Sequence, residues 1–179
     1  MPRFSQISEQ RLAGCHPALQ KLMHHAIRDI DFSVLDQGGW RSPEQQLVLY
    51  DLGKTKVLRS KHNHTHEGKP WSLAVDIAPY PVDFGQTPKQ ILKTYVDTRM
   101  TARTFATLEQ QFIRSAKNQA RFYFLAGMIK ERADQLNIRI KWGGDWDSDL
   151  DFFDQTFDDL VHYELVGYEN RPYDIGELL

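Results

Sequence analysis

A short run near the carboxyl end of the chain, Asp-Leu-Val-His-Tyr-Glu at residues 159–164, puts the strongest constraint on the fold. Residues 161–166 are apolar and aromatic around this run, which is typical of a strand. Side chains alternate between the faces of a strand, so His162 and Glu164 share one face and Tyr163 occupies the other. The pattern places a carboxylate beside an imidazole, and the rest of the fold must supply partners for both.

Two upstream segments can supply those partners. Asp76 lies toward the end of an otherwise apolar strand at residues 73–78, and a lone buried carboxylate is costly unless a cation or donor meets it. Zinc, the guanidinium of Arg41 and a backbone donor are the partners we consider. Together, His62, Asp76 and His162 would give zinc three protein ligands and leave one position for water. An open position of this kind is typical of catalytic rather than structural zinc sites.

Each of these residues also has an ordinary interpretation. A single histidine is more often a surface or hydrogen-bonded residue than a metal ligand. Asp76 would then be a cap at a strand end, and Asp159 a turn residue. The combination of the residues, rather than any one of them, indicates a hydrolytic metal site.

Hydrophobic periodicity predicts an α+β fold in a single domain over residues 1–179, because helices and strands mix without regular alternation. Ser42-Pro43 is a strong helix start, with a capping hydroxyl before proline. The polar, histidine-rich residues 54–72 are expected to form a loop. We expect helices over 17–31, 43–53 and within 105–137, and strands over 32–35, 73–78, 138–142 and 161–166.

The long helix within 105–137 is expected to bury one apolar face. The helix at 17–31 is expected to pack on the domain. The predicted face of the long helix consists of Phe105, Leu108, Phe112, Ala116, Ala120, Tyr123, Phe124, Met128 and Leu136.

Composition excludes several classes of protein. No run of eighteen apolar residues is present, which excludes a membrane span, and the first residues lack the apolar stretch of a secretory signal. Residues 141–179 hold eleven acidic residues against two basic ones, so the charge does not resemble that of a nucleic-acid binder. Cys15 is the one cysteine, and we expect a buried structural thiol.

Four segments of the chain carry the motifs considered above. They are Gly39-Trp40-Arg41-Ser42 with Gln45 and Tyr50; Ser60-Lys61-His62; Ala74-Val75-Asp76-Ile77-Ala78-Pro79-Tyr80-Pro81; and Trp142-Gly143-Gly144-Asp145-Trp146 continuing to Asp159-Leu160-Val161-His162-Tyr163-Glu164-Leu165. These segments resemble the zinc peptidases related to D-alanyl-D-alanine carboxypeptidases, in particular the L-alanyl-D-glutamate endopeptidases that phages use as endolysins. The resemblance covers residues 33–166 in the family's order and implies a hedgehog/DD-peptidase-like fold with an antiparallel sheet and flanking helices.

The resemblance implies a role for each site residue. His62, Asp76 and His162 match the ligands of one Zn²⁺ ion. Asp159 matches the carboxylate that takes a proton from the zinc-bound water and returns it to the leaving amine. Arg41 matches the arginine that stabilises the substrate carbonyl as it becomes an oxyanion.

One departure from the family pattern concerns the first ligand. In the compact pattern the histidine and aspartate are close, as His-x-x-Gly-x-Ala-x-Asp, whereas here His62 and Asp76 are fourteen positions apart. His64 and His66 lie between them and could compete for the ligand role. Ser60 precedes His62 at the family's offset, which favours His62.

The resemblance implies an endolysin that hydrolyses the L-alanyl-D-glutamate bond of peptidoglycan stem peptides and so lyses a bacterium. Such an antimicrobial bacteriophage enzyme would act as a monomer, wait in the host cytoplasm, and reach the periplasm and cell wall after a holin opens the membrane. Two alternatives stay open: a D-alanyl-D-alanine carboxypeptidase or dipeptidase, and a wall-binding module without catalysis.

A second cation site is a further hypothesis. Asp145, Asp147, Asp149 and Asp151 alternate in an acidic segment, and calcium prefers such oxygen ligands. Phe152, however, occupies the position where an EF-hand loop requires glycine. The alternative is a solvated acidic loop.

Overall fold

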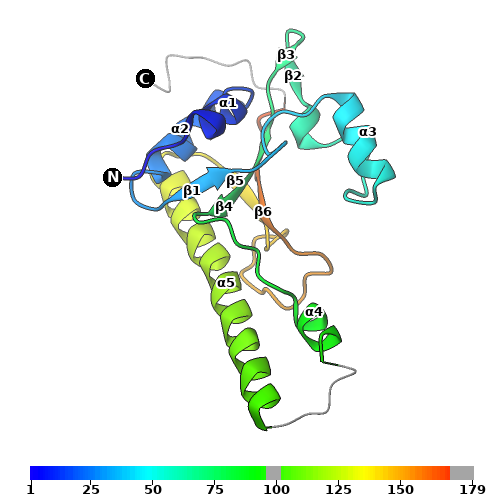
Figure 1. The fold of residues 1–179 in the computed structure, drawn as a ribbon. Helices are drawn as coiled ribbons and strands as arrows, with labels where there is room; N and C mark the ends of the chain where they lie inside the picture. Colours follow the sequence, from blue (N-terminus) through cyan, green and yellow to red (C-terminus); the bar gives the residue numbers. More distant parts are fainter. Residues whose placement is uncertain (96–101, 170–179) are drawn as a thin grey trace.

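Four strands form the central sheet of the structure, a computed structural model that describes residues 1–95 and 102–169. Neighbouring strands are antiparallel throughout, in the order β1-β4-β6-β5 (Figure 1). β4 is buried along its whole length, as its apolar sequence requires of a central strand. The strands are β1 (Phe32–Val34), β4 (Ala74–Pro79), β5 (Ile140–Gly143) and β6 (Asp159–Leu165).

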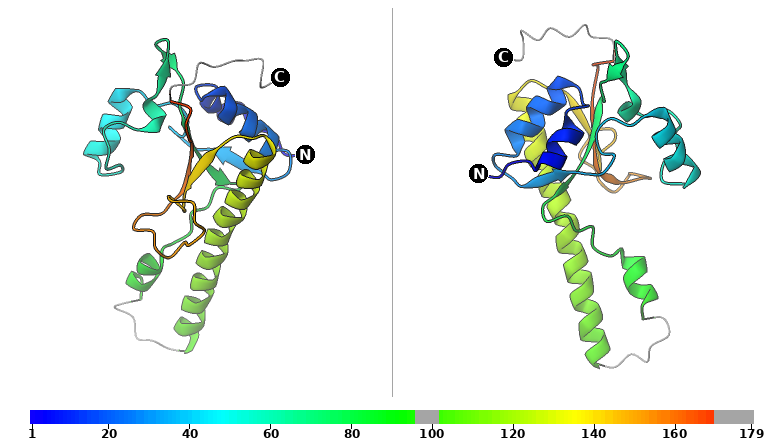
Figure 2. Two further views of the ribbon diagram at one scale, coloured as in Figure 1. Left: turned by 180° about the vertical axis from the view of Figure 1, so that it is seen from behind. Right: turned by 45° about the horizontal axis from the view of Figure 1, so that its top comes forward.

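Helices flank this sheet on both sides (Figures 1 and 2). The helices α1 (Gln6–Leu12) and α2 (Pro17–Ala26) share one side with the carboxyl-terminal half of α5 (Ala102–Gln135), and α3 (Pro43–Asp51) lies on the other. The α+β class, the antiparallel sheet and the flanking helices are therefore confirmed. The largest buried core side chains include Leu19, Leu22, Phe32, Ile77, Leu125, Ile129, Tyr163 and Leu165.

Local capping explains where the first helices begin. His16 caps α2, because its Nδ1 accepts the backbone N–H of Ala18 at 3.0 Å and Pro17 occupies the first turn. Ser42 and Gln45 form a reciprocal capping box at α3. The predicted helix start at Ser42-Pro43 is confirmed, whereas the helix predicted over 17–31 ends at Ala26, where the chain turns toward β1.

The predicted strands all form, with bounds that differ by at most two residues. α1 was not predicted. The segment predicted as a loop, 54–72, is irregular only in part: it contains the 3₁₀ helix η1 (Lys61–Asn63) and a hairpin of β2 (Thr65–His66) and β3 (Lys69–Pro70). Cys15 is buried as expected.

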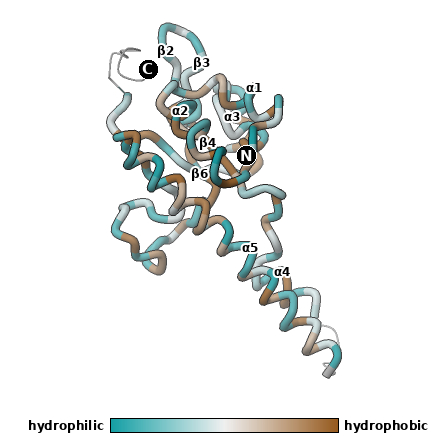
Figure 3. Tube along the Cα trace, turned by 90° about the vertical axis from the view of Figure 1, so that its left-hand side faces the viewer, coloured by the Kyte–Doolittle hydropathy of each residue, from teal (hydrophilic) through white to brown (hydrophobic). Residues whose placement is uncertain are grey.

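The face predicted to be buried on α5 was wrong. Phe105 and Phe124 are 62% and 65% exposed, whereas the buried side chains of this helix include Phe122, Leu125 and Ile129. Two causes combine. The buried face of α5 is shifted by about one residue in the sequence from the predicted face, and the amino-terminal half of the helix extends past the sheet. Figures 1 and 3 show this half pointing away from the sheet beside the short helix α4 (Pro88–Lys93).

We call α4 and residues 102–121 of α5 the arm, and the sheet with the helices packed on it the body. Ile91 of α4 is buried, and Ser115 of α5 donates to the carbonyl of Gln86 at 2.5 Å. Within residues 1–95 and 102–169, no helix has both the length and the apolar character needed to cross a membrane.

Candidate metal centre

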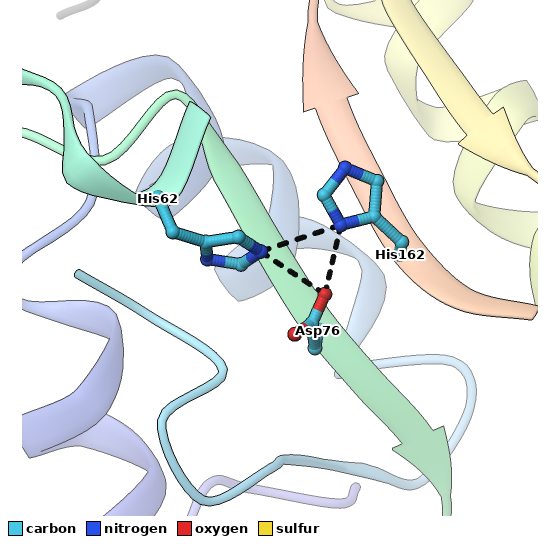
Figure 4. A group of neighbouring side chains, drawn as sticks. All are labelled: His62, Asp76 and His162. Atoms are coloured by element: carbon cyan, nitrogen blue, oxygen red, sulfur yellow. Dashed lines mark hydrogen bonds and ion pairs between the residues drawn. The ribbon is translucent and has the colours of Figure 1, made fainter. Parts of the chain in front are cut away.

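Three side chains from separate elements converge beside the sheet: His62 from η1, Asp76 from β4 and His162 from β6 (Figure 4). The Nε2 atom of His62 lies 3.3 Å from Nδ1 of His162 and 3.2 Å from Oδ1 of Asp76. The third edge, from Nδ1 of His162 to Oδ1 of Asp76, is 3.0 Å. All three residues are buried.

The strand register accounts for two corners of this triangle. Asp76 and His162 are directly paired across β4 and β6, so their side chains project from the same face of the sheet. Backbone hydrogen bonds bring the third corner to them: the N–H of Leu73 donates to Lys61, and the N–H of Arg41 donates to His62. The two distances are both 3.0 Å, and they fix η1 beside the start of β4.

A second group of contacts orients both imidazoles. The Nδ1 atom of His62 lies 2.7 Å from the carbonyl of Gly39, which can only accept, so this nitrogen carries the proton and Nε2 presents a lone pair to the centre. His162 is turned the other way, with Nε2 3.4 Å from Glu164 and Nδ1 toward the centre. Outer partners of this kind hold the ligand histidines of metal sites in one tautomer.

The dimensions of the triangle fit a metal ion. Two ligand atoms that are each ~2.0–2.1 Å from a tetrahedral ion lie about 3.4 Å apart. The observed edges of 3.0–3.3 Å approach that value, and a small outward shift of the side chains would complete it. Two histidine nitrogens and one carboxylate oxygen also form a donor set typical of zinc. The cluster could therefore hold a metal ion.

Electrostatics at the cluster favour a positive charge. Burial alone would raise the pKa of Asp76, but His62 and His162 hold it well below its usual range. Burial alone would lower the pKa of His162, but hydrogen bonds to Asp76 and Glu164 raise it to about 9. The protein thus stabilises one cationic charge between these side chains, which a proton or a metal ion can provide.

Arg41 binds the opposite side of the Asp76 carboxylate. Its Nη2 donates to Oδ2 of Asp76, and its Nε donates to the carbonyl of Gln37 at 2.6 Å. Zinc and Arg41 were considered as alternative partners for Asp76, and the geometry allows both at once, one on each carboxylate oxygen. The guanidinium also lines the cleft in front of the cluster.

Asp159 begins β6 and lines the same cleft. Burial raises the pKa of its carboxyl, and the charge of Asp76 adds to that effect, although His162, His62 and Arg41 oppose it. The structure therefore brings all five predicted site residues, His62, Asp76, His162, Asp159 and Arg41, to one cleft of about 900 Å³.

The two rival histidines lie outside the cluster. His64 is directed toward the carbonyl of Trp71, 3.3 Å from its Nδ1, and His66 is exposed in the hairpin with its ring against Trp71. Of the three histidines in this segment, the described structure brings only His62 within reach of Asp76.

Two groups at the site were not found from the sequence. The carbonyl of Gly39 carries no side-chain signal, although the glycine itself is a hint, since a Cβ there would lie 2.0 Å from the carbonyl oxygen of Arg11. Phe157 lines the cleft from residues 144–158 between β5 and β6, which we call the acidic loop. Trp146 also lines the cleft, with its ring centroid 5.6 Å from that of His162.

The acidic loop brings Asp145, Asp147 and Asp149 close enough for one oxygen of each to meet a common ion, and Asp151 is not part of this group. Asp145 already accepts the backbone N–H of Asp149 at 3.2 Å, and Asp147 and Asp149 are exposed. Exposed carboxylates commonly cluster without an ion, so the calcium site stays a prediction without support.

Comparison with known proteins gives a likeness to a solved structure. No protein-family model matches the chain, and no curated protein matches it. The fold is similar to the crystal structure of the Serratia marcescens L-Ala D-Glu endopeptidase ChiX, with a TM-score of 0.56 and 22% identity over 92% of this chain and 90% of that one. At this identity the likeness shows a shared fold, in agreement with the fold that the sequence resemblance implies.

Proposed function

We propose that this chain is a zinc-dependent peptidoglycan hydrolase that cleaves the L-alanyl-D-glutamate bond of stem peptides. The observation that carries the proposal is the His62–Asp76–His162 triangle, with edges of 3.0–3.3 Å, in a cleft large enough for a peptide. The shared fold with an L-Ala D-Glu endopeptidase supports the choice of bond.

A zinc ion held by His62, Asp76 and His162 would supply Lewis acidity and a bound water with a pKa near ~7. Asp159 then takes the proton of the attacking water and delivers it to the leaving amine. Its position in the cleft and its raised pKa suit this role, because a carboxyl that is too acidic is a weak base.

Arg41 has two tasks in this proposal. Its contact with Oδ2 of Asp76 keeps Oδ1 directed at the two histidines. The same guanidinium faces the cleft and stabilises negative charge on the carbonyl oxygen of the scissile bond. Gly39 and Glu164 act through the two histidines, because they fix the ring orientations of His62 and His162.

The biological setting we propose is that of a phage endolysin, which meets peptidoglycan after a holin opens the host membrane. The resemblance of the four sequence segments to phage enzymes supports this setting. A monomer suffices for it, since all five site residues come from one chain.

Digestion of purified stem peptides followed by mass spectrometry tests the reaction. We expect new amino termini at glutamate, and dialysis against a chelator should abolish their release until zinc is restored. Loss of terminal alanine alone would identify a D-alanyl-D-alanine carboxypeptidase or dipeptidase instead. Binding to peptidoglycan without any released fragment would identify a wall-binding module.

Metal content tests the assignment of the first ligand. His62→Ala should lose stoichiometric zinc, whereas the matched variant His64→Ala, two residues along the same segment, should retain it. Full zinc retention in His62→Ala, or loss only in His64→Ala, would overturn the assignment.

A further inference from the structure

One wall of the cleft is strongly basic. The segment 53–61, with the sequence Gly-Lys-Thr-Lys-Val-Leu-Arg-Ser-Lys, contains four cations and no acid. Most of its residues line the cleft in front of the metal centre, and they include Lys54, Lys56, Arg59 and Lys61. The mechanism proposed above uses none of these four side chains.

A buried amide holds this segment in place. Gln46 of α3 is fully buried, and its Nε2 donates to the carbonyl of Val57 at 2.8 Å and to Oγ1 of Thr55 at 3.4 Å. The backbone N–H of Lys54 donates to Leu49 at 2.8 Å. Such anchoring of the backbone leaves the neighbouring cations exposed, so the wall is a fixed surface rather than a free loop.

The basic wall also contacts the opposite side of the cleft. The ammonium of Lys56 lies 5.6 Å from the centroid of the Phe157 ring, within the range of a cation–π contact. Phe157 belongs to the acidic loop and lines the cleft with Trp146. Lys56 is therefore held over the cleft instead of pointing into bulk solvent.

In the part of the chain that the structure describes, carboxylates form an ion pair with one of the four cations of this wall and not with the other three. Asp36 pairs with Arg11 at 3.0 Å, Glu164 contacts His162, and Asp76 is engaged with the metal centre. Lys61 pairs with Glu169.

Three cations remain on the wall. In residues 1–95 and 102–169, no carboxylate forms an ion pair with Lys54, Lys56 or Arg59. An unpaired positive wall beside a hydrolytic centre attracts an anionic substrate.

We propose that Lys54, Lys56 and Arg59 form a subsite for free carboxylates of the peptide that is cleaved. This inference rests on the proposed function. A D-glutamate that continues the stem through its side-chain carboxyl keeps its α-carboxylate free, one carbon from the scissile nitrogen. The cations bind that group, or the next free carboxylate along the stem, and so select acidic stems over amidated ones.

Binding to an inactive variant tests the subsite separately from the reaction. Calorimetry is carried out on zinc-loaded Asp159→Asn protein with two pairs of stem tripeptides. In the first pair, the glutamate α-carboxylate is free in one peptide and amidated in the other. The second pair differs in the same way at the next carboxylate along the stem. The variant Lys54→Gln/Lys56→Gln/Arg59→Gln should bind an acidic peptide about tenfold more weakly, and the fully amidated one with nearly unchanged affinity.

The arm offers a matched control. Lys89→Gln/Lys93→Gln/Lys117→Gln removes the same number of charges from exposed positions that do not line the cleft, and it should leave both affinities unchanged. Equal losses for acidic and amidated peptides, no loss at all, or an equal effect of the control variant would overturn the subsite.

The two proposals fail in different ways. Release of fragments by the unmodified protein, with no preference for acidic stems, would reject the subsite and keep the hydrolase. A carboxylate-dependent affinity without any released fragment would keep the subsite and reject the hydrolase. Tighter binding of inorganic phosphate than of the acidic tripeptide, again lost in the triple variant, would show a phosphate site and reject the carboxylate assignment.

Discussion

The two halves of α5 belong to the same helix but lie in different surroundings. The carboxyl-terminal half buries Phe122, Leu125 and Ile129 in the body, whereas the amino-terminal half lies in the arm and exposes Phe105 and Ile113. A helix of 34 residues spans about 50 Å at ~1.5 Å per residue, so it extends well past the sheet. The body therefore carries the core and the candidate metal centre, and the arm contributes to neither.

The largest expected effect comes from removing one carboxylate in the body, compared with removing one carboxylate in the arm. Asp159→Asn should lower the rate of stem-peptide cleavage by about 10²–10⁴-fold, because it removes the base that accepts the proton of water. Bound zinc should stay stoichiometric, since Asp159 is not among the three ligands. Glu109→Gln, an equivalent change on an exposed arm position, should leave the rate unchanged. Steady-state kinetics and metal analysis check both, and an equal loss in the two variants would contradict the division.

The second comparison uses the same substitution at two positions of α5. Phe122→Ala should lower the free energy of unfolding by about 3–5 kcal/mol, because this ring is 4% exposed and leaves a cavity. Phe105→Ala in the arm should cost less than about 0.5 kcal/mol, because its ring is largely exposed. Denaturant titration measures both. Similar values at the two positions would mean that the arm packs against something in solution.

A third comparison concerns the pH dependence of stability in the body and in the arm. All seven histidines lie outside the arm. His16 is buried against Trp71 and Tyr168, and burial, followed by the charges of His64 and His66, lowers its pKa to about 4. The unfolded chain binds this proton near pH 6.5, so stability falls as pH decreases from about 6.5 toward 4.

His16→Asn keeps a capping side chain at α2 and removes this titration. Between pH 7 and pH 5 the unmodified protein should lose about 2 kcal/mol more stability than the variant does. Thermal or denaturant unfolding at the two pH values measures the difference. Parallel pH profiles would show that the pKa of His16 is the same in the folded and the unfolded chain.

The smallest expected effect compares two helix caps. Ser42 and Thr87 each form a capping box before a proline, one at α3 and one at α4 of the arm. Ser42→Ala should weaken α3 by about 1 kcal/mol, and Thr87→Ala should weaken α4 by a similar amount. Hydrogen exchange should accelerate only within the helix concerned. Acceleration across β4 or β6 in the Thr87→Ala variant would show that the arm is coupled to the body.

Local signals in the sequence predicted much of the body. The strand at 161–166 and the capped start at Ser42-Pro43 depend on short-range patterns, and both were confirmed. The buried face of α5 could not be read in this way. Apolar residues such as Phe105 continue the helical period into the arm, where no sheet lies beneath them.

The candidate site was also predictable from the sequence only in part. The residue types and the family resemblance brought His62, Asp76 and His162 together before any geometry was known, and the structure finds them within 3.3 Å of one another. Their outer partners were less accessible to sequence reasoning. The carbonyl of Gly39 and the basic wall depend on how a loop closes against the sheet, and a loop between distant elements has no periodicity that fixes its position.

The direct pairing of Asp76 with His162 has a consequence for folding. If β6 slipped by one residue along β4, the imidazole and the carboxylate would face opposite sides of the sheet. A divalent ion would then find no chelate, so it would bind only chains whose strands have aligned correctly. Its binding energy would add to the stability of that one alignment, so a bound ion would favour the correct register of the sheet during folding.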